Sequence, residues 1–479
     1  MSGGSNGNRE QLLTNTRTTE RGGRVSVASE EAAASCALAA DIVQRAIRGG
    51  ASEAECTISE GDEFSVGVRL GEVEKLKEAG SRGAGLRVLI GQCAGSSYTS
   101  DLTPEGLDFM IDSALSLARV TTEDPFAGLP SAEEFGCING DLHLYYNDVA
   151  TLAPERKIEL ARQAERAALD TDPRINNSEG GSFDSYIGMR TFANSRGFAG
   201  SYRSSSCSLS AVPVARQGDS MERDWWYSLA RSSAALEPPE QVGRLAAERV
   251  LRRLAPRKVE TQKAPVVFEP RTAQSLLESI FEAVCGDAVY RRASFLAGKL
   301  GERIASENLT VIDDGTLPGL FGTSPFDDEG VASRRTVVIE RGVLKSYLLN
   351  AYTARKLGMK TTGNASRGLS GNAGIGHGNF YLERGAYSPD DILRSVRNGF
   401  YVTELIGSGV NIVTGDYSLG ATGLWIENGE LAYPVSEVTI AGTLQQILLD
   451  VEMVGSDLEF RGSMAAPTLL IREMTISGR

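Results

Sequence analysis

Runs in which apolar and polar residues alternate fill residues 53–98, and this period of two constrains the fold more than any other feature. Gly or charged turns separate the runs, which are AECTIS (54–59), EFSVGVRL (63–70), EVEKLKEAG (72–80) and AGLRVLIGQCAGSSY (84–98). Alternation puts successive side chains on opposite faces of a strand, as in an antiparallel sheet with one buried face. The sequence therefore predicts short strands joined as an antiparallel meander.

Helices are predicted on both sides of these runs. Ser29 precedes two Glu and predicts the cap of an Ala-rich helix that ends at Gly49. Pro104 predicts the start of a second helix, with apolar positions at Leu107, Met110, Ile111, Leu115 and Leu117. Two more helices, over 154–169 and 239–254, enclose a Ser- and Gly-rich region of strands. These patterns indicate an α+β fold.

The second half is predicted to contain more strand than helix. A strand over 264–269 precedes an amphipathic helix, and two hairpins follow over 337–349 and 424–435, the latter with an Asn-Gly turn. We place a domain boundary at ProArgLys, 256–258. The expected organisation is therefore a flexible tail, an N-terminal α+β domain and a β-rich C-terminal domain with antiparallel sheets, over 1–27, 28–256 and 257–479.

Composition bounds the function classes. The formal net charge of −13 repels phosphate backbones, so nucleic acid is not an expected partner. The basic cluster 252–258 is interpreted as the C-terminal end of a helix, where cations favour the dipole. No apolar run is long enough to span a bilayer. Six cysteines without a C-x-x-C pair predict reduced, mostly buried thiols in a cytoplasmic protein.

The segment LLESIFEAVCGD, residues 276–287, is the main candidate for chemistry. Its apolar residues form one stripe of a helix, namely Leu276, Leu277, Ile280, Phe281 and Val284. Glu278 and Glu282 lie on the other side, either as a solvated face or, with Asp287, as a carboxylate site for a hard cation. The chain has only two histidines, His143 and His377, which are not in ligand spacing. Cys285 is interpreted as an inert buried thiol.

Two loops are weighed as sites. GNAGIGHGN (371–379) lacks the features of a phosphate-binding loop, so we interpret it as backbone beside a cavity where peptide lies. PheAspAspGluGly (326–330) could attract a cation, but it lacks calcium-loop spacing and is typical of a turn.

Six blocks in order give the chain a resemblance to the TldD/PmbA family, and within it to the PmbA (TldE) branch. They are GDAVYRRASFLAGKLGE (286–302), DDGTLPGLFGTSPFDDEGV (313–331), RGVLKSYLLNAYTARKLG (341–358), TTGNASRG (361–368), VTGDYSLGATGLWIENGELAYPVSE (413–437) and RGSMAAPTLLI (461–471). The resemblance covers residues 265–479 closely, and the N-terminal half agrees in layout.

In the TldD branch, the equivalent helix carries His-Glu-x-x-x-His, and a Cys near the C-terminus completes the metal site. Aligned through GlyAsp at 286–287, this chain has Leu277 and Glu282 in place of the two histidines and keeps Glu278. The segment 455–470 contains no Cys. The resemblance thus implies a chain with no metal of its own and no activity alone, since Glu278 would face water that no metal activates.

The resemblance further implies a heterodimer in which a TldD-like chain supplies zinc or another divalent metal and this chain closes a chamber for unfolded or extended peptides. Family roles include the processing of peptide antibiotics, the degradation of an antitoxin and a historical link to DNA gyrase. The Ser- and Gly-rich strands at 178–183 and 201–210 could bind peptide along a strand edge or be surface strands. Residues considered for the cavity are Asp287, Phe326, Asp327, Asp328, Glu329, Asn364, His377 and Asn379.

Two alternatives remain open. The chain could be a self-associating peptide-binding or scaffold protein that works without TldD, with a homodimer forming in isolation. It could instead be a stand-alone peptidase that uses a carboxylate-bound metal.

Overall fold

The structure, a computed structural model, describes residues 26–478. Most of the predicted flexible tail, 1–27, lies outside the described residues, and Ser26 and Val27 begin the first helix. The N-terminal half consists of α2 (Ser26–Arg48), β1 (Glu53–Arg69), β2 (Glu72–Ile90), β3 (Cys93–Thr99), α3 (Pro104–Val120), α4 (Asn147–Thr151), α5 (Pro154–Leu169), β4 (Ile175–Asn194), β5 (Ala199–Gln217), β6 (Ser220–Arg223), β7 (Trp226–Ala230) and α6 (Pro239–Leu251).

One large antiparallel sheet dominates this half, with strand order β3-β2-β1-β4-β5-β6 and β7 paired to β5. The four short runs of residues 53–98 are not four strands, because the first two form β1 and the third continues into β2. The segments that resemble turns in sequence pair with each other, since Gly61 lies opposite Ser81 and Asp62 opposite Gly80. Ladder hydrogen bonds use backbone alone, so polar and Gly residues do not interrupt them.

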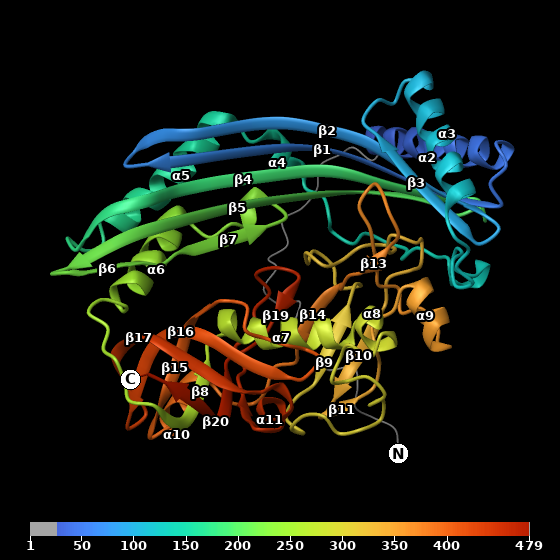
Figure 1. The fold of residues 1–479 in the computed structure, drawn as a ribbon. Coiled ribbons are helices and arrows are strands. Elements are labelled where there is room, and N and C mark those ends of the chain that lie inside the picture. The colour runs from blue at the N-terminus through green and yellow to red at the C-terminus, as the bar shows by residue number, and fades with distance from the viewer. Residues whose placement is uncertain (1–25, 479) are drawn as a thin grey trace, which may run out of the picture.

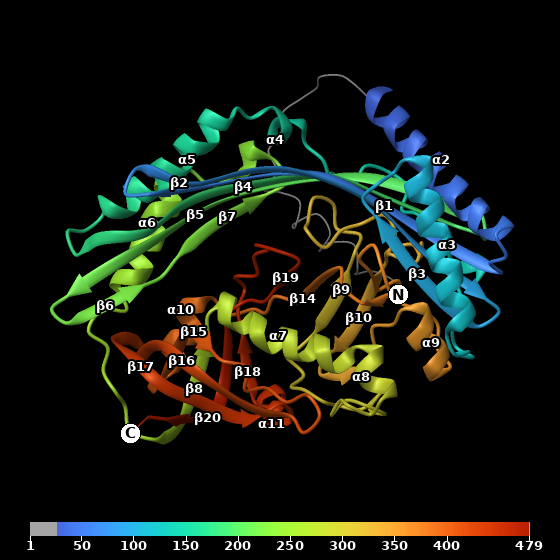
Figure 2. The same cartoon turned by 45° about the horizontal axis from the view of Figure 1, so that its top comes forward.

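The sheet is curved and arches over the C-terminal half, as Figures 1 and 2 show. Helices cover its outer face in two groups, α2 with α3 near one end and α5 with α6 near the other. On β1, the first group covers Ala54, Cys56 and Ile58, and the second group covers Phe64, Val66 and Val68. The predicted apolar stripe of α3 is confirmed except for Leu117, which is 48% exposed.

The C-terminal half contains two further main sheets, ordered β11-β10-β9-β14-β19 and β17-β16-β15-β8-β20-β18, and a small pair β12-β13. Its strands are β8 (Gln262–Phe268), β9 (Val311–Asp314), β10 (Arg335–Glu340), β11 (Val343–Leu344), β12 (Ala365–Ser366), β13 (Gly374–Ile375), β14 (Asn379–Leu382), β15 (Asn398–Ile406), β16 (Asp416–Glu427), β17 (Glu430–Thr443), β18 (Val451–Val454), β19 (Met464–Ala465) and β20 (Leu469–Ser477). The helices are α7 (Pro270–Val284), α8 (Gly286–Tyr290), α9 (Ala351–Leu357), α10 (Pro389–Ser395) and α11 (Leu444–Leu449). The predicted α+β class is confirmed.

Both predicted hairpins form. Asn428 and Gly429 join β16 to β17 with φ values of 53° and 82°, the left-handed conformation that a tight Asn-Gly turn requires. The hairpin predicted over 337–349 is shorter than expected, because its second strand, β11, ends at Leu344.

Ion pairs join the two halves where α6 leads into β8. Arg249 and Arg252 both donate to Glu269, at 2.8 and 2.9 Å, and Arg253 donates to Glu404 of β15 over 2.5 Å. The cluster 252–258 follows the C-terminal end of α6 as predicted, with Arg252 at the C-cap, and Arg252 and Arg253 in addition pair with specific carboxylates. The predicted domain boundary at 256–258 lies in this connecting segment.

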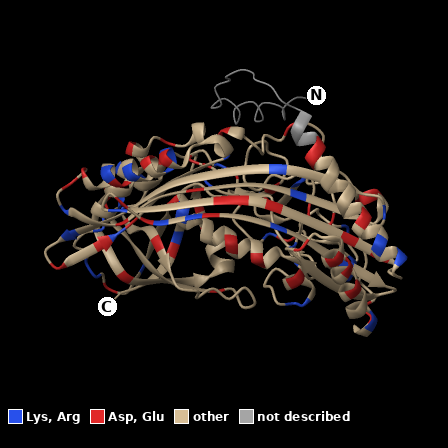
Figure 3. Ribbon diagram, turned by 90° about the horizontal axis from the view of Figure 1, so that it is seen from above, with Lys and Arg blue, Asp and Glu red and all other residues tan. Residues whose placement is uncertain are grey.

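Surface features match the composition in part. Basic and acidic residues are interspersed over the view from above in Figure 3. Between residues 26 and 478, each helix is too short or too polar to cross a bilayer. All six cysteines are free, but only Cys56 and Cys207 are buried. The expectation of mostly buried thiols is wrong, since Cys137, for example, lies exposed in a loop.

Candidate functional site

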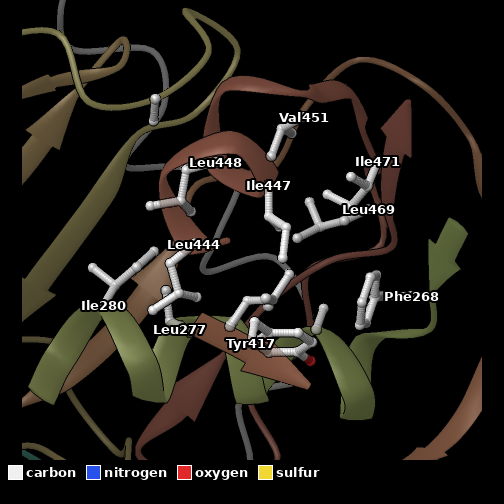
Figure 4. Close-up of a cluster of buried hydrophobic side chains, with 14 of the residues drawn as sticks. Phe268, Leu277, Ile280, Tyr417, Leu444, Ile447, Leu448, Val451, Leu469 and Ile471 are labelled. Carbon is white, nitrogen blue, oxygen red and sulfur yellow. The ribbon is translucent and has the colours of Figure 1, made fainter. Parts of the chain in front are cut away.

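Helix α7 lies beneath the large sheet, and its sequence explains its position. Pro270 begins the helix without losing a hydrogen bond, because the first helical N–H has no partner within a helix. Leu277 and Ile280 point into the core toward α11 and β16 (Figure 4). Buried Leu, Ile and Val residues thus fix this helix by its apolar stripe.

Positions 277 and 282, which align with the two histidines of the TldD-branch motif, face different environments. Leu277 is 1% exposed and lies among the side chains of Tyr417 and Leu444, whereas Glu282 is exposed. Positions five apart on a regular helix are rotated by about 140° from each other, given 3.6 residues per turn. The helix therefore presents these two positions to the core and to the surface respectively.

Glu278 lies exposed on the same side of α7 as Glu282. Its pKa is raised by partial burial and then by the negative charge of Glu282. This repulsion makes Glu278 a weaker acid than usual, but no cation is held between the two carboxylates by a third donor. Across residues 26–478, no three His, Cys, Asp or Glu side chains come together as a metal site. The side chains on α7 therefore do not fit a divalent metal.

Cys285 follows α7 and is half-buried, so the prediction of a buried thiol is wrong in degree. Burial, then the charges of Asp287 and Glu282, raises the pKa of its thiol to about 12. A thiol with this pKa stays protonated at neutral pH and is a poor nucleophile. No imidazole contacts it, so its environment favours an inert role.

Five of the residues considered for the cavity line one small cavity of about 160 Å³ between β5 and the C-terminal half, namely Phe326, Asp327, Asp328, Asn364 and His377. Asp287 and Glu329 line a separate, larger cavity of about 560 Å³. Asn379 lines neither cavity, and its amide bridges Asp314 O and Thr323 Oγ1 at 2.7 and 2.9 Å. The structure therefore divides the candidate set between two places.

Asp327 organises the loop 326–331. Its Oδ1 accepts from the backbone N–H of Glu329 and of Val331, both at 2.9 Å, and Oδ2 accepts from Ala365 N at 2.9 Å. Burial, then the charge of Glu329, raises the pKa of Asp327 to about 8. The three bonds hold two loops in place, which is the turn-forming role that the sequence favours.

Asp328 and Phe326 attach the same loop to the large sheet. Arg190 of β4 donates from Nε to Asp328 Oδ1 over 2.7 Å. The ring of Phe326 meets the rings of Phe198 and Tyr202 edge to face, with centroids 5.2 and 5.5 Å apart. These contacts are part of the interface between the two halves.

His377 packs against α7, although the two are distant in sequence. Its ring lies 4.8 Å from the ring of Phe281, edge to face, and its Nδ1 lies 2.8 Å from Gly378 O. Burial lowers the pKa of this imidazole, so it is neutral at pH 7. His143, in contrast, lies exposed beside Asp141 in another part of the chain.

Asp313 is a buried acid that sequence reasoning missed. It lines the small cavity with His377, and it accepts from Asn364 Nδ2 and Gly378 N, both at 2.7 Å. Burial raises its pKa to about 7. The Asp pair in VIDD (311–314) gave a signal, because two acids at the end of an apolar strand are unusual there.

The Ser- and Gly-rich stretches 178–183 and 201–210 have strand partners on both sides over only part of their length. β4 pairs with β5 along the first stretch, but its pairing with β1 ends at Gly181 and does not reach residues 178–180. β5 pairs with β4 along the second stretch and with β7 from Cys207 onward, so residues 201–206 have a strand partner on one side only. Peptide binding along these strand edges stays a prediction, and Ser182 and Ser210 contact each other at 2.9 Å between hydroxyl oxygens.

Comparison with known proteins places the chain in a family. Residues 54–118 match PmbA/TldA metallopeptidase domain 1, residues 147–254 match the central domain, and residues 261–478 match the C-terminal domain. The chain is 39% identical to Metalloprotease PmbA of Escherichia coli O157:H7, over 90% of this chain and 93% of that protein. It is 36% identical to the Metalloprotease PmbA homolog of Haemophilus influenzae, over 91% and 94% respectively. The chain belongs to the PmbA/TldD metallopeptidase family.

Solved structures agree with this assignment. A candidate modulator of DNA gyrase from Bacteroides thetaiotaomicron superposes with a TM-score of 0.86 at 29% identity, over 95% of this chain and 100% of that one. TldE from Thermococcus kodakarensis shares the fold, with a TM-score of 0.82 at 22% identity, over 92% of this chain and 100% of that one. The family relationship supports a role related to proteolysis.

Proposed function

We propose that this chain is the non-catalytic, PmbA/TldE-type subunit of a metalloprotease whose TldD-like partner carries the zinc or other divalent metal. The observation that supports this most directly is the environment of Leu277. Its side chain offers no lone pair and is packed into the apolar core, at the position that aligns with the first histidine of the TldD-branch motif.

Glu278 is the one acid of the His-Glu-x-x-x-His motif that this chain keeps, and it does not restore catalysis. A general base needs a water whose pKa a metal has lowered, or a substrate proton of suitable acidity. Glu278 has a raised pKa but lies on an exposed helix face beside another carboxylate. The proposed substrates are unfolded or extended peptides, and the proposed location is the cytoplasm.

Two alternative functions make different predictions. A self-associating peptide-binding or scaffold protein would bind peptide without a TldD-like partner and would not cleave it. A stand-alone carboxylate-metal peptidase would need Glu278, Glu282 and Asp287 around one ion, and these three do not form such a group in the structure.

The experiment combines the purified chain with a purified TldD-like protein from the same source and denatured casein. The proposal predicts a stable complex by size-exclusion chromatography with light scattering, and casein cleavage only in the mixture. Leu277→Met serves as a matched variant that keeps the core, and it should leave both results unchanged. Cleavage by this chain alone, or no complex with the partner, would contradict the proposal.

A further inference from the structure

The larger cavity, of about 560 Å³, lies where the β2–β3 end of the large sheet meets α8 and α9. Loops 121–128 and 371–374 complete its wall. This volume is within the range of small-molecule sites, about 300–1,000 Å³. No residue of α7 lines this cavity, so the role proposed for α7 does not use it.

Glu329 and Arg87 both line the cavity, and we call these two residues its floor. Glu329 is 5% exposed, and Oε2 accepts from Ala351 N at the start of α9 over 2.8 Å. Within residues 26–478, no hydrogen bond engages its Oε1, and the side chain lines the cavity. Burial, then the charge of Glu55, raises the pKa of Glu329 to about 7. An ionised carboxylate oxygen that no protein donor engages is an acceptor for a donor group on a ligand.

Arg87 is the second residue of this floor. It donates from Nε to Asn372 Oδ1 and from Nη1 to Glu55 Oε1, both over 2.9 Å. Its Nη2 has no hydrogen bond to any described residue. Glu55 is shared with Arg367, so two guanidinium groups face one carboxylate there. Arg87 and Arg367 also act on Glu329, where their positive charges oppose the rise in its pKa.

Aromatic rings line the wall above this floor. Tyr290 and Tyr352 meet edge to face with centroids 6.2 Å apart, and the Tyr352 hydroxyl donates to Asp124 Oδ2 over 2.8 Å. Asp287 and Arg291 line the cavity as well. The rings can cover the apolar part of a ligand or the face of an ammonium group.

We propose that this cavity binds a zwitterionic short peptide, with the ammonium group at Glu329 Oε1 and the carboxylate at Arg87 Nη2. The two unengaged atoms belong to groups of opposite charge that line the same cavity, which matches a molecule that carries both charges. An ammonium group supplies donors for the carboxylate, and a guanidinium is a preferred partner of a carboxylate. The site uses residues of this chain only, so it does not depend on a TldD-like partner.

The test measures the binding of dialanine to the full chain by isothermal titration calorimetry, with N-acetyl-dialanine and dialanine amide as probes of each charge. We expect saturable one-to-one binding of dialanine, weakened at least about tenfold by either modification, since a tenfold change is 1.4 kcal/mol. Between pH 5.5 and 7.0 dialanine stays mostly zwitterionic, because the pKa of an α-amino group is about 7.7–8.0. The affinity for dialanine should rise at least about fivefold over this range, as Glu329 loses its proton.

Three variants locate the site. Glu329→Gln keeps an acceptor for Ala351 N and should weaken dialanine binding at least about tenfold. Ala127→Trp fills the cavity from the half-exposed loop and should abolish binding without touching the floor. Glu430→Gln changes an exposed strand residue and should have no effect. Thermal melts confirm that each variant is folded.

The proposal is overturned if the wild type shows no saturable dialanine binding at concentrations up to about 10 mM. This limit also covers binding about tenfold weaker than a Kd of 1 mM, which corresponds to about −4.1 kcal/mol. It is also overturned if Ala127→Trp binds as tightly as the wild type. Either outcome leaves the test of complex formation and casein cleavage unaffected.

Discussion

Arg367 and Glu55 are 312 residues apart in sequence, yet Nη1 of Arg367 donates to Oε1 of Glu55 over 2.5 Å between the two halves of the molecule. Their side chains are 3% and 2% exposed. Burial alone would raise the pKa of Glu55, but the charges of Arg367 and Arg87 outweigh it and lower the pKa. The pair therefore ties β1 of the large sheet to the loop after β12.

Arg367→Met should lower the free energy of unfolding by about 3–5 kcal/mol, because it leaves a buried carboxylate short of one partner. Urea denaturation at pH 7 measures the loss. Arg341→Met is the matched control, since Arg341 is 75% exposed in its pair with Glu307 and should cost less than about 1 kcal/mol. Equal losses in both variants would show that the buried pair has no special role.

Leu277→His should destabilise the protein by about 2–5 kcal/mol and should not create a zinc site. The imidazole would replace a Leu that is 1% exposed, so apolar contacts are lost and a polar group is buried. Glu282→His, on the exposed face of α7, should leave stability within about 0.5 kcal/mol of the wild type. Thermal melts and zinc equilibrium dialysis check both. Tight zinc binding by the double variant would contradict the account of α7.

Stability should fall as the pH rises from about 4 to 8, because Asp313, Asp327 and Glu329 have pKa values raised to about 7, 8 and 7 by burial. The unfolded carboxyl groups lose their protons near pH 4, so the folded state binds more protons in this window. Stability contributed by the protonated forms is therefore complete below pH 4 and lost above the folded pKa values. Urea denaturation series across this range measure the slope.

Asp313→Asn isolates one of these groups. The variant should reduce the fall in stability between pH 4 and 7 by up to about 1.4 kcal/mol per pH unit, since Asn does not titrate. Asp390→Asn is the control, because the Asp390 side chain is 80% exposed. An unchanged slope in Asp313→Asn would mean that this carboxyl is ionised in the folded protein.

Gly85→Ala should destabilise the contact between the large sheet and the loop at Leu369. A Cβ at position 85 would lie 1.7 Å from Leu369 O, so backbone must move. The expected cost is about 1–3 kcal/mol or more, as for overpacking. Gly368→Ala, one residue before that loop contact, meets nothing within 4 Å and should change stability by less than about 1 kcal/mol. Differential scanning calorimetry compares the two.

Local patterns predicted the elements that local chemistry determines. The stripe of α7, the start of α3 at Pro104 and the Asn428–Gly429 turn follow from spacing and backbone preference, and all three form. The predicted strands are shorter than β1 and β2, because pairing continues through Gly and charged residues once both strands are aligned. Pairing partners are long-range and leave no mark in a short window.

In the candidate site, too, local features could be predicted from the sequence and long-range contacts could not. Asp327 and Asp328 were identified as a turn from their own sequence, and the structure shows the bonds that make it. Other features depend on loops that meet only in the fold. They are the contact of His377 with Phe281, the burial of Asp313, and the atoms of Arg87 and Glu329 that line the cavity without a hydrogen-bond partner. The spacing of residues along the sequence does not predict these long-range contacts.

The most direct test of the central claim is elemental analysis of the partner-free chain after exposure to zinc and removal of the excess, combined with a casein assay on the same sample. The account predicts less than stoichiometric metal and no cleavage, because Leu277 offers no donor and Glu278 and Glu282 lie exposed without a third ligand. One tightly held metal per chain, with cleavage that a chelator abolishes and zinc restores, would contradict it.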